Sequence, residues 1–210
     1  MHDPRGPNGS GPSRRDFLKG SGAAAAATAL AKAPLAVAEA YLPQAGVPAV
    51  GPGAARIQLN VDGKTMTQNV EPRVTLLDAL RNYLDVTGCK RVCDRGTCGA
   101  CTVMLDGKPV YSCTMLAVEA QGHEIKTAES LIADGKLDAV PAAFAKYDAQ
   151  QCGFCTPGFV VAMRAAFDKN PQASPAEIEE GLSGNICRCG TYSQMRDAIA
   201  SLCKSQGKGE

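Results

Sequence analysis

Ten cysteines constrain this chain more than any other feature of its 210 residues. All of them lie at or beyond Cys89, and eight fall into two tight groups. The first group is Cys93, Cys98, Cys101 and Cys113, and the second is Cys152, Cys155, Cys187 and Cys189. Grouped thiols serve as metal ligands or as cross-links, so the function of the chain is sought in its cysteines.

Composition and charge limit the size of the domains and the kinds of partner and metal site that this chain can have. Hydrophobic residues make up 45% of the chain, which suits one medium domain or two small ones with cores of their own. From Ala54 onward, 17 Lys and Arg face 18 Asp and Glu, so no nucleic-acid partner is expected. The histidines are His2 and His123 alone, and His2 lies in the N-terminal segment that is predicted below to be removed. The one remaining histidine cannot build a Rieske centre or a two-histidine zinc finger. His123 is expected to be a solvated loop residue.

The N-terminal segment has the pattern of an export signal. Arg14 and Arg15 precede Phe17, Leu18 and an alanine-rich run that reaches Ala31. The 12 residues between Lys19 and Lys32 would span about 18 Å as a helix, too short for a hydrocarbon core of about 30 Å. We therefore predict a twin-arginine signal over residues 1–38, no membrane anchor, a linker over 39–53, and export of the folded protein to the periplasm.

The pattern over 54–130 predicts a hairpin and a helix before the cysteine loop and a second hairpin after it. Alternating apolar residues over 57–61, a turn at Asp62-Gly63 and a second strand toward Val70 predict a hairpin. Thr75 can cap a helix whose apolar residues run from Leu76 to Leu84. Residues 101–113 predict another hairpin, which turns at Asp106-Gly107.

The first cysteine group has the spacing C-x4-C-x2-C, with Cys113 closing the set from the far end of the hairpin. This is the plant-type 2Fe-2S pattern. Gly96, Gly99 and Ala100 would let the loop backbone approach the sulfurs. Choosing Cys89 instead of Cys93 would break the spacing, so Cys89 is predicted to be a free thiol. Three positively charged residues flank the ligands: Lys90, Arg91 and Arg95. Either they raise the reduction potential of the cluster, or they are ordinary solvated loop residues.

Beyond His123 the pattern predicts helices over 141–147, 158–169, 175–182 and 193–204. Ser174 and Glu177 form a capping box for the third of them. Cys203 lies on the apolar face of the last helix and is expected to be a core residue.

The second cysteine group would bring two pairs from different helix ends around one metal site. An iron-sulfur cluster is the main interpretation. Zinc is the rival, although the single residue between Cys187 and Cys189 fits zinc spacing poorly. Disulfides are a further alternative in an exported chain, but cysteines packed so closely along the sequence make poor cross-links.

Three motifs together resemble the small iron-sulfur subunit of the xanthine oxidase family of molybdenum hydroxylases. They are Gly-Thr-Cys-Gly-Ala-Cys-Thr-Val at 96–103, Gln-Cys-Gly-Phe-Cys-Thr-Pro-Gly at 151–158 and Gly-Asn-Ile-Cys-Arg-Cys-Gly-Thr-Tyr at 184–192. The resemblance runs from about Arg56 to Lys204. With the export signal, the chain looks most like the iron-sulfur subunit of a periplasmic aldehyde oxidoreductase. One departure is Gly190-Thr191, where much of the family has Thr-Gly.

The resemblance implies an α+β chain, with a β-grasp, plant-type ferredoxin-like domain over 54–130 and an all-α four-helix domain over 131–210. Each domain would hold one 2Fe-2S cluster on its four cysteines. Electrons would pass from molybdopterin on a large subunit through both clusters to FAD on a third subunit, with Gln151 against the pterin. The chain would hold no catalytic residue for an aldehyde or an N-heterocycle. A free-standing double-cluster carrier and a zinc-binding export protein are the alternative functions.

Overall fold

A computed structural model describes residue 19 and residues 51–206. Apart from Lys19, the predicted signal segment lies outside the described residues, as does most of the predicted linker. No helix within the described ranges is long and apolar enough to cross a membrane.

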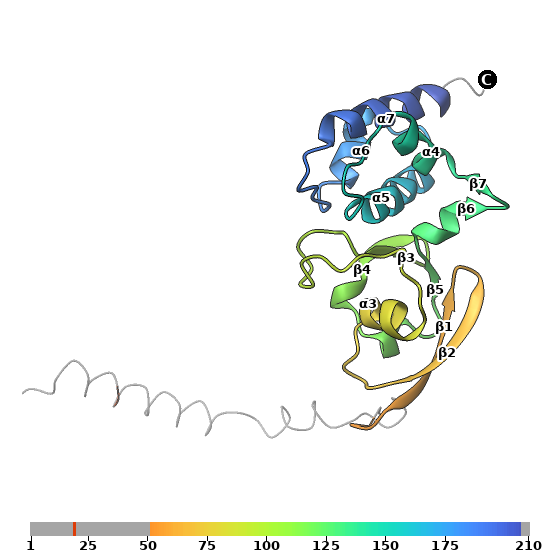
Figure 1. Cartoon of the computed structure of the whole chain (residues 1–210), viewed down its shortest axis with the longest axis vertical. Coiled ribbons are helices and arrows are strands. Elements are labelled where there is room, and N and C mark those ends of the chain that lie inside the picture. Colours follow the sequence, from red (N-terminus) through yellow and green to blue (C-terminus); the bar gives the residue numbers. More distant parts are fainter. Residues whose placement is uncertain (1–18, 20–50, 207–210) are drawn as a thin grey trace, which may run out of the picture. The chain divides into compact units, whose positions relative to one another are not determined.

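A five-stranded sheet organises the first part of the described chain (Figure 1). The hairpin β1 (Ala55–Val61) and β2 (Lys64–Val70) and the hairpin β3 (Thr102–Leu105) and β4 (Lys108–Tyr111) lie on either side of β5 (Glu124–Lys126). The strand order is β2-β1-β5-β3-β4, with β1 and β5 parallel and the other pairs antiparallel. Asp62-Gly63 and Asp106-Gly107 form the two turns with positive φ at both residues, as the Asp-Gly pattern predicts.

One face of this sheet is covered by the predicted capped helix, in a shorter form than expected. Thr75 caps it by accepting the Asp78 N–H at 3.1 Å, but α3 covers only Leu76–Asp78. The chain then widens into a π-helical turn over Ala79–Tyr83, in which the Leu84 N–H donates to the Ala79 carbonyl at 3.1 Å. The wider turn keeps the apolar face against the sheet. The buried core here includes Ile57, Leu59, Val61, Leu76, Leu77, Leu80 and Ile125.

Four α-helices form the second part: α4 (Ala139–Lys146), α5 (Thr156–Lys169), α6 (Pro175–Gly181) and α7 (Tyr192–Gln206). Each begins and ends within two residues of its predicted bounds. Ser174 and Glu177 make the predicted capping box at the start of α6. Apolar faces of the helices meet in a second core that includes Val140, Phe144, Phe159, Met163, Phe167, Ile178 and Ile199.

Two β elements lie where the sequence predicted only helices. β5 follows His123 directly, and β6 (Ile132–Ala133) pairs with β7 (Lys136–Leu137) across the Asp134-Gly135 turn. β5 has three residues and buries only Ile125, so it is too short for its alternation to indicate a strand; its pairing comes from β1 and β3. The His123 side chain is 43% exposed and contacts Asp106, with Nδ1 and Oδ2 2.6 Å apart.

The sheet and the helices share a small buried apolar cluster. Met104 of β3 packs with Val161 and Ala165 of α5. The described chain is therefore an α+β structure in which one helix lies against the sheet and brings the two cysteine groups near each other.

Candidate metal centres

The first cysteine group lies on the loop that follows the π-helical turn and on the turn after β4. Cys93, Cys98 and Cys101 lie on the loop, and Cys113 lies in a 3-10 turn over Ser112–Thr114, directly after β4. Gly99 has φ of +70°, and a Cβ there would sit 2.6 Å from the Asn185 side-chain nitrogen. A side chain at this position would thus be both strained and blocked.

Backbone N–H groups point at the sulfurs of this loop. Gly96 donates to Cys113 Sγ at 3.2 Å and Thr97 donates to Cys93 Sγ at 3.4 Å. Bonds from the backbone of Arg95 and Thr97 lower the pKa of Cys93 to about 7. Burial raises the pKa of Cys101 to about 12, and its neighbour Cys113 adds to the rise. Hydrogen bonds from N–H groups stabilise a thiolate, so the loop favours the anionic form of Cys93.

The four thiols of the first group all affect one phenol, that of Tyr111. Burial raises the pKa of Tyr111, and negative charge on Cys101, Cys98, Cys113 and Cys93 raises it further. Within the group the sulfurs meet in pairs, Cys93 with Cys98 and Cys101 with Cys113. The four predicted residues therefore lie in two pairs, on this loop and on the 3-10 turn that follows β4.

The second group forms where two loops of the helical part meet. Cys152 precedes α5 and Cys155 is its N-cap, whereas Cys187 and Cys189 lie on the loop between α6 and α7. Cys152 and Cys189 form an exposed pair, with their sulfurs 3.4 Å apart. Cys155 and Cys187 form an inner pair; burial and Cys187 raise the pKa of Cys155 to about 12.

The pairwise meeting of the sulfurs fits a binuclear cluster. In the described part of the chain, no three His, Cys, Asp or Glu side chains converge as they would on a single metal ion. A 2Fe-2S cluster instead takes four thiolates, two on each iron. Each group offers two such pairs, and backbone N–H groups point at the first set as they would at an anionic cluster.

The two remaining cysteines belong to neither set of pairs, although Cys89 is buried in the same apolar cluster as Cys101 and Cys113. Cys89 is 1% exposed, and burial raises its pKa to about 11. Cys203 is half-buried against the helical core, as expected of a core residue. Of the three flanking cations, Lys90 donates to the Thr87 carbonyl at 2.8 Å, and Arg91 pairs with Asp78 and with Asp94. The Arg95 Nε–H donates to the Cys93 carbonyl at 3.2 Å, within the ligand loop.

A seam of hydrogen bonds joins the two cysteine loops. The Ile186 N–H donates to the Cys98 carbonyl at 3.0 Å, and the buried Asn185 amide donates to the Gly99 carbonyl at 2.9 Å. The Tyr111 hydroxyl donates to the Gly184 carbonyl at 2.8 Å. Sequence reasoning did not predict these contacts, although Asn185 and Gly184 belong to one of the motifs that carry the resemblance.

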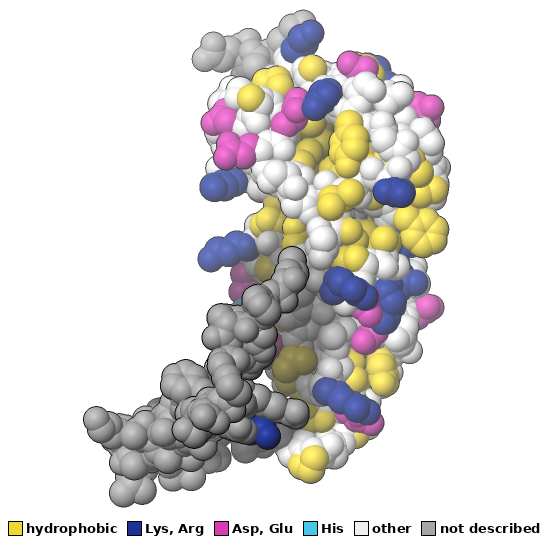
Figure 2. All heavy atoms as spheres, turned by 90° about the vertical axis from the view of Figure 1, so that its left-hand side faces the viewer, with side chains coloured by type: hydrophobic (Ala, Val, Ile, Leu, Met, Phe, Trp, Pro, Cys, Tyr) yellow, Lys and Arg dark blue, Asp and Glu magenta, His cyan; other side chains and the backbone are white. Residues whose placement is uncertain are grey.

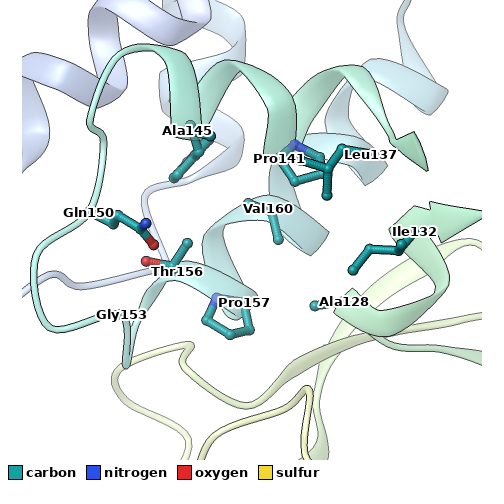
Figure 3. A pocket seen from close by; sticks show the side chains of 11 residues that line it. Ala128, Ile132, Leu137, Pro141, Ala145, Gln150, Gly153, Thr156, Pro157 and Val160 are labelled. Atoms are coloured by element: carbon teal, nitrogen blue, oxygen red, sulfur yellow. The ribbon is translucent and has the colours of Figure 1, made fainter. Parts of the chain in front are cut away.

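Two polar residues beside the second group differ in their surroundings. Gln151 is exposed next to the exposed Cys152. Thr156 follows Cys155 and lines a mainly apolar pocket of about 250 Å³, shown in Figure 3 with Gln150 beside it. The Thr156 hydroxyl oxygen is buried without a hydrogen-bond partner.

Three family models match the chain. They are a twin-arginine translocation pathway signal sequence over residues 11–31, a 2Fe-2S iron-sulfur cluster binding domain over 59–132 and a [2Fe-2S] binding domain over 127–200. Two 2Fe-2S-binding domains and a signal for export to the periplasm are therefore present.

Relatives place these domains in one kind of enzyme. The beta subunit of the 6-hydroxypseudooxynicotine dehydrogenase complex of Paenarthrobacter nicotinovorans is 45% identical over 69% of this chain and 91% of its own length. The aldehyde oxidoreductase iron-sulfur-binding subunit PaoA of Escherichia coli K12 is 41% identical over 89% of this chain and 86% of its own.

A solved structure agrees with these relatives. Quinoline 2-oxidoreductase from Pseudomonas putida 86 matches with a TM-score of 0.69 and 42% identity, over 75% of this chain and 98% of the matched one. The chain is thus an electron-transfer subunit of an oxidoreductase, and it belongs to the iron-sulfur subunits of the xanthine oxidase family of molybdenum hydroxylases.

Proposed function

We propose that this chain passes electrons from a molybdopterin subunit to an FAD subunit through two 2Fe-2S clusters. One cluster would be held by Cys93, Cys98, Cys101 and Cys113, the other by Cys152, Cys155, Cys187 and Cys189. Such clusters, when bound, supply one-electron transfer. The sulfur pairs support two ligands per iron, and the Ile186–Cys98 hydrogen bond, at 3.0 Å, carries the proposal because it joins the two loops directly.

The finer architecture of the chain is part of the proposal. A β-grasp, plant-type ferredoxin-like domain would cover residues 54–130, and an all-α four-helix domain would cover 131–210. The sheet order and the four helices support this division. Residues 1–38 would be the signal that is removed and 39–53 a linker.

The exposure of the sulfurs supports a direction for the electrons. Cys152 and Cys189 are exposed, and Cys152 directly follows Gln151, whereas Cys155 and Cys187 are more buried. Ile186, which precedes Cys187, donates its N–H to the Cys98 carbonyl on the loop of the first group. Electrons would enter at the exposed pair from the pterin, with Gln151 against it, and leave through the first cluster. The match to PaoA includes the N-terminal region and favours an aldehyde as the substrate of the complex.

Exposed apolar side chains next to the second cysteine group would form the docking surface for the molybdopterin subunit. Phe154 is 58% exposed between Cys152 and Cys155, and Ile186 is 49% exposed directly before Cys187. Figure 2 looks onto the side on which the cysteine loops lie in Figure 1 and shows hydrophobic side chains exposed there. Apolar groups so placed are typical of a protein interface.

Phe154→Asp is expected to weaken binding to the molybdopterin subunit of the same complex about 30-fold, because a charge would be buried where an aromatic anchor packs, a loss of about 2 kcal/mol. Titration calorimetry with the purified subunits measures it. Ile132→Asp is the control, since Ile132 is 56% exposed but lies in the β6–β7 hairpin. Equal loss of affinity in both variants, or no loss in Phe154→Asp, would contradict the docking surface.

A wild-type chain that binds no molybdopterin subunit would favour a free-standing carrier.

A further inference from the structure

Thr191 occupies a buried position between the last cysteine and α7. It is 1% exposed and directly precedes α7, and its carbonyl accepts the Met195 N–H at 3.1 Å. Its hydroxyl oxygen lies 3.3 Å from the sulfur of Cys187. Cys187 belongs to the inner sulfur pair and is itself buried, so this contact is shielded from water.

The direction of this hydrogen bond follows from the chemistry of metal ligation. Between a thiol and an alcohol, either group can donate. A metal-bound cysteine is a thiolate and has no proton, so the Thr191 hydroxyl must be the donor when Cys187 is a ligand.

The surroundings hold the donor and the acceptor in place. The Cys187 N–H donates to the Tyr192 hydroxyl oxygen at 2.8 Å, so residues 191 and 192 fix the sulfur and the backbone of the same cysteine. Thr191 is β-branched and fully packed, which limits the rotation of its side chain. The hydroxyl therefore stays directed at the sulfur instead of turning toward solvent.

We propose that Thr191 sets the reduction potential of the helical-domain cluster through the hydrogen bond from its hydroxyl to Cys187. The inference rests on the proposed ligand set. Reduction adds one electron, taken from the electron donor, to the cluster and increases the negative charge on its sulfurs. A donor at the sulfur stabilises the reduced form more than the oxidised form, and so raises the potential.

Thr191→Val tests this on the full chain with its clusters loaded. Valine has the same shape but no hydroxyl. At the wild-type midpoint potential, the ratio of reduced to oxidised helical-domain cluster is expected to fall about tenfold, a shift of about 59 mV for a one-electron couple. EPR-monitored redox titration measures it, and the signal of the other cluster serves as an internal reference that does not move. Thr191→Ser keeps the hydroxyl and should keep the potential.

Thr156→Val is the matched control. It removes a hydroxyl next to a proposed ligand, Cys155, but that hydroxyl has no hydrogen-bond partner, so neither potential should shift. A purely structural role for Thr191 at the start of α7 would lower the unfolding temperature of Thr191→Val and leave the potential unchanged. If Thr191→Val does not load its clusters, Thr191→Ala removes the hydroxyl without placing a second methyl group in the buried site.

Each outcome bears on one claim only. A lower potential in Thr191→Val or Thr191→Ala, with Thr191→Ser unchanged, supports the inference. The same potential in all three variants overturns it and leaves the ligand set standing. A wild-type chain without the second EPR signal contradicts the proposed ligands themselves.

Discussion

The Cys155→Ser chain is expected to lose the EPR signal of the helical-domain cluster and to keep the signal of the other, with bound iron falling from about four to about two. Burial raises the pKa of the Cys155 thiol to about 12, so its thiolate persists only beside strongly positive irons. A serine hydroxyl at this inner position would not ionise. Low-temperature EPR of the reduced protein and iron analysis measure the loss, and Cys98→Ser should give the reverse pattern.

The two cysteines outside the pairs are the controls. Cys89 is buried with its pKa raised to about 11, and Cys203 packs against the helical core. Cys89→Ser and Cys203→Ser should therefore keep both signals. Loss of the first cluster in Cys89→Ser would show that Cys89, and not Cys93, completes that ligand set.

Features that depend on near neighbours in the sequence could be predicted. The two Asp-Gly turns and the two helix caps are set by residues within a few positions of each other: Asp62-Gly63, Asp106-Gly107, Thr75 and Ser174. Hairpins and helix starts follow local rules, so their positions agree with the structure. The family resemblance, now confirmed, was carried by the same local motifs.

Features that depend on distant partners could not be predicted. Tyr111 reaches Gly184 across 73 positions and Asn185 reaches Gly99 across 86. Each is an ordinary polar residue when the sequence around it is considered alone. β5 was missed for the same reason, because three residues with one buried side chain become a strand only between β1 and β3. The short α3 also depends on packing, since its apolar pattern fits a longer α-helix equally well.

The seam between the cysteine loops depends on backbones that nearly touch. Gly158, in the first turn of α5, is buried, and a Cβ there would lie 2.2 Å from the Gly99 carbonyl oxygen and 3.0 Å from Ala100 Cα. Both neighbours are backbone atoms of the loop that carries Cys98 and Cys101. They cannot rotate aside as a flexible side chain would, so the loop or the helix must shift.

Gly158→Ala is therefore expected to destabilise the chain, although alanine in a helix normally stabilises by about 1 kcal/mol relative to glycine. Overpacking costs about 1–3 kcal/mol, and each kcal/mol lowers the unfolding temperature of a chain of this size by about 2–4 °C. Gly181→Ala, at the end of α6, is the matched control: its Cβ would make an ordinary 3.4 Å contact with Ala166, so it should be neutral or stabilising. Thermal unfolding compares the two variants. Hydrogen exchange at the Ile186 N–H, which donates to Cys98, should become faster in Gly158→Ala alone, because the substitution opens the seam. Equal stability of the two variants, with unchanged exchange at Ile186, would show that the loops are not held by this close approach.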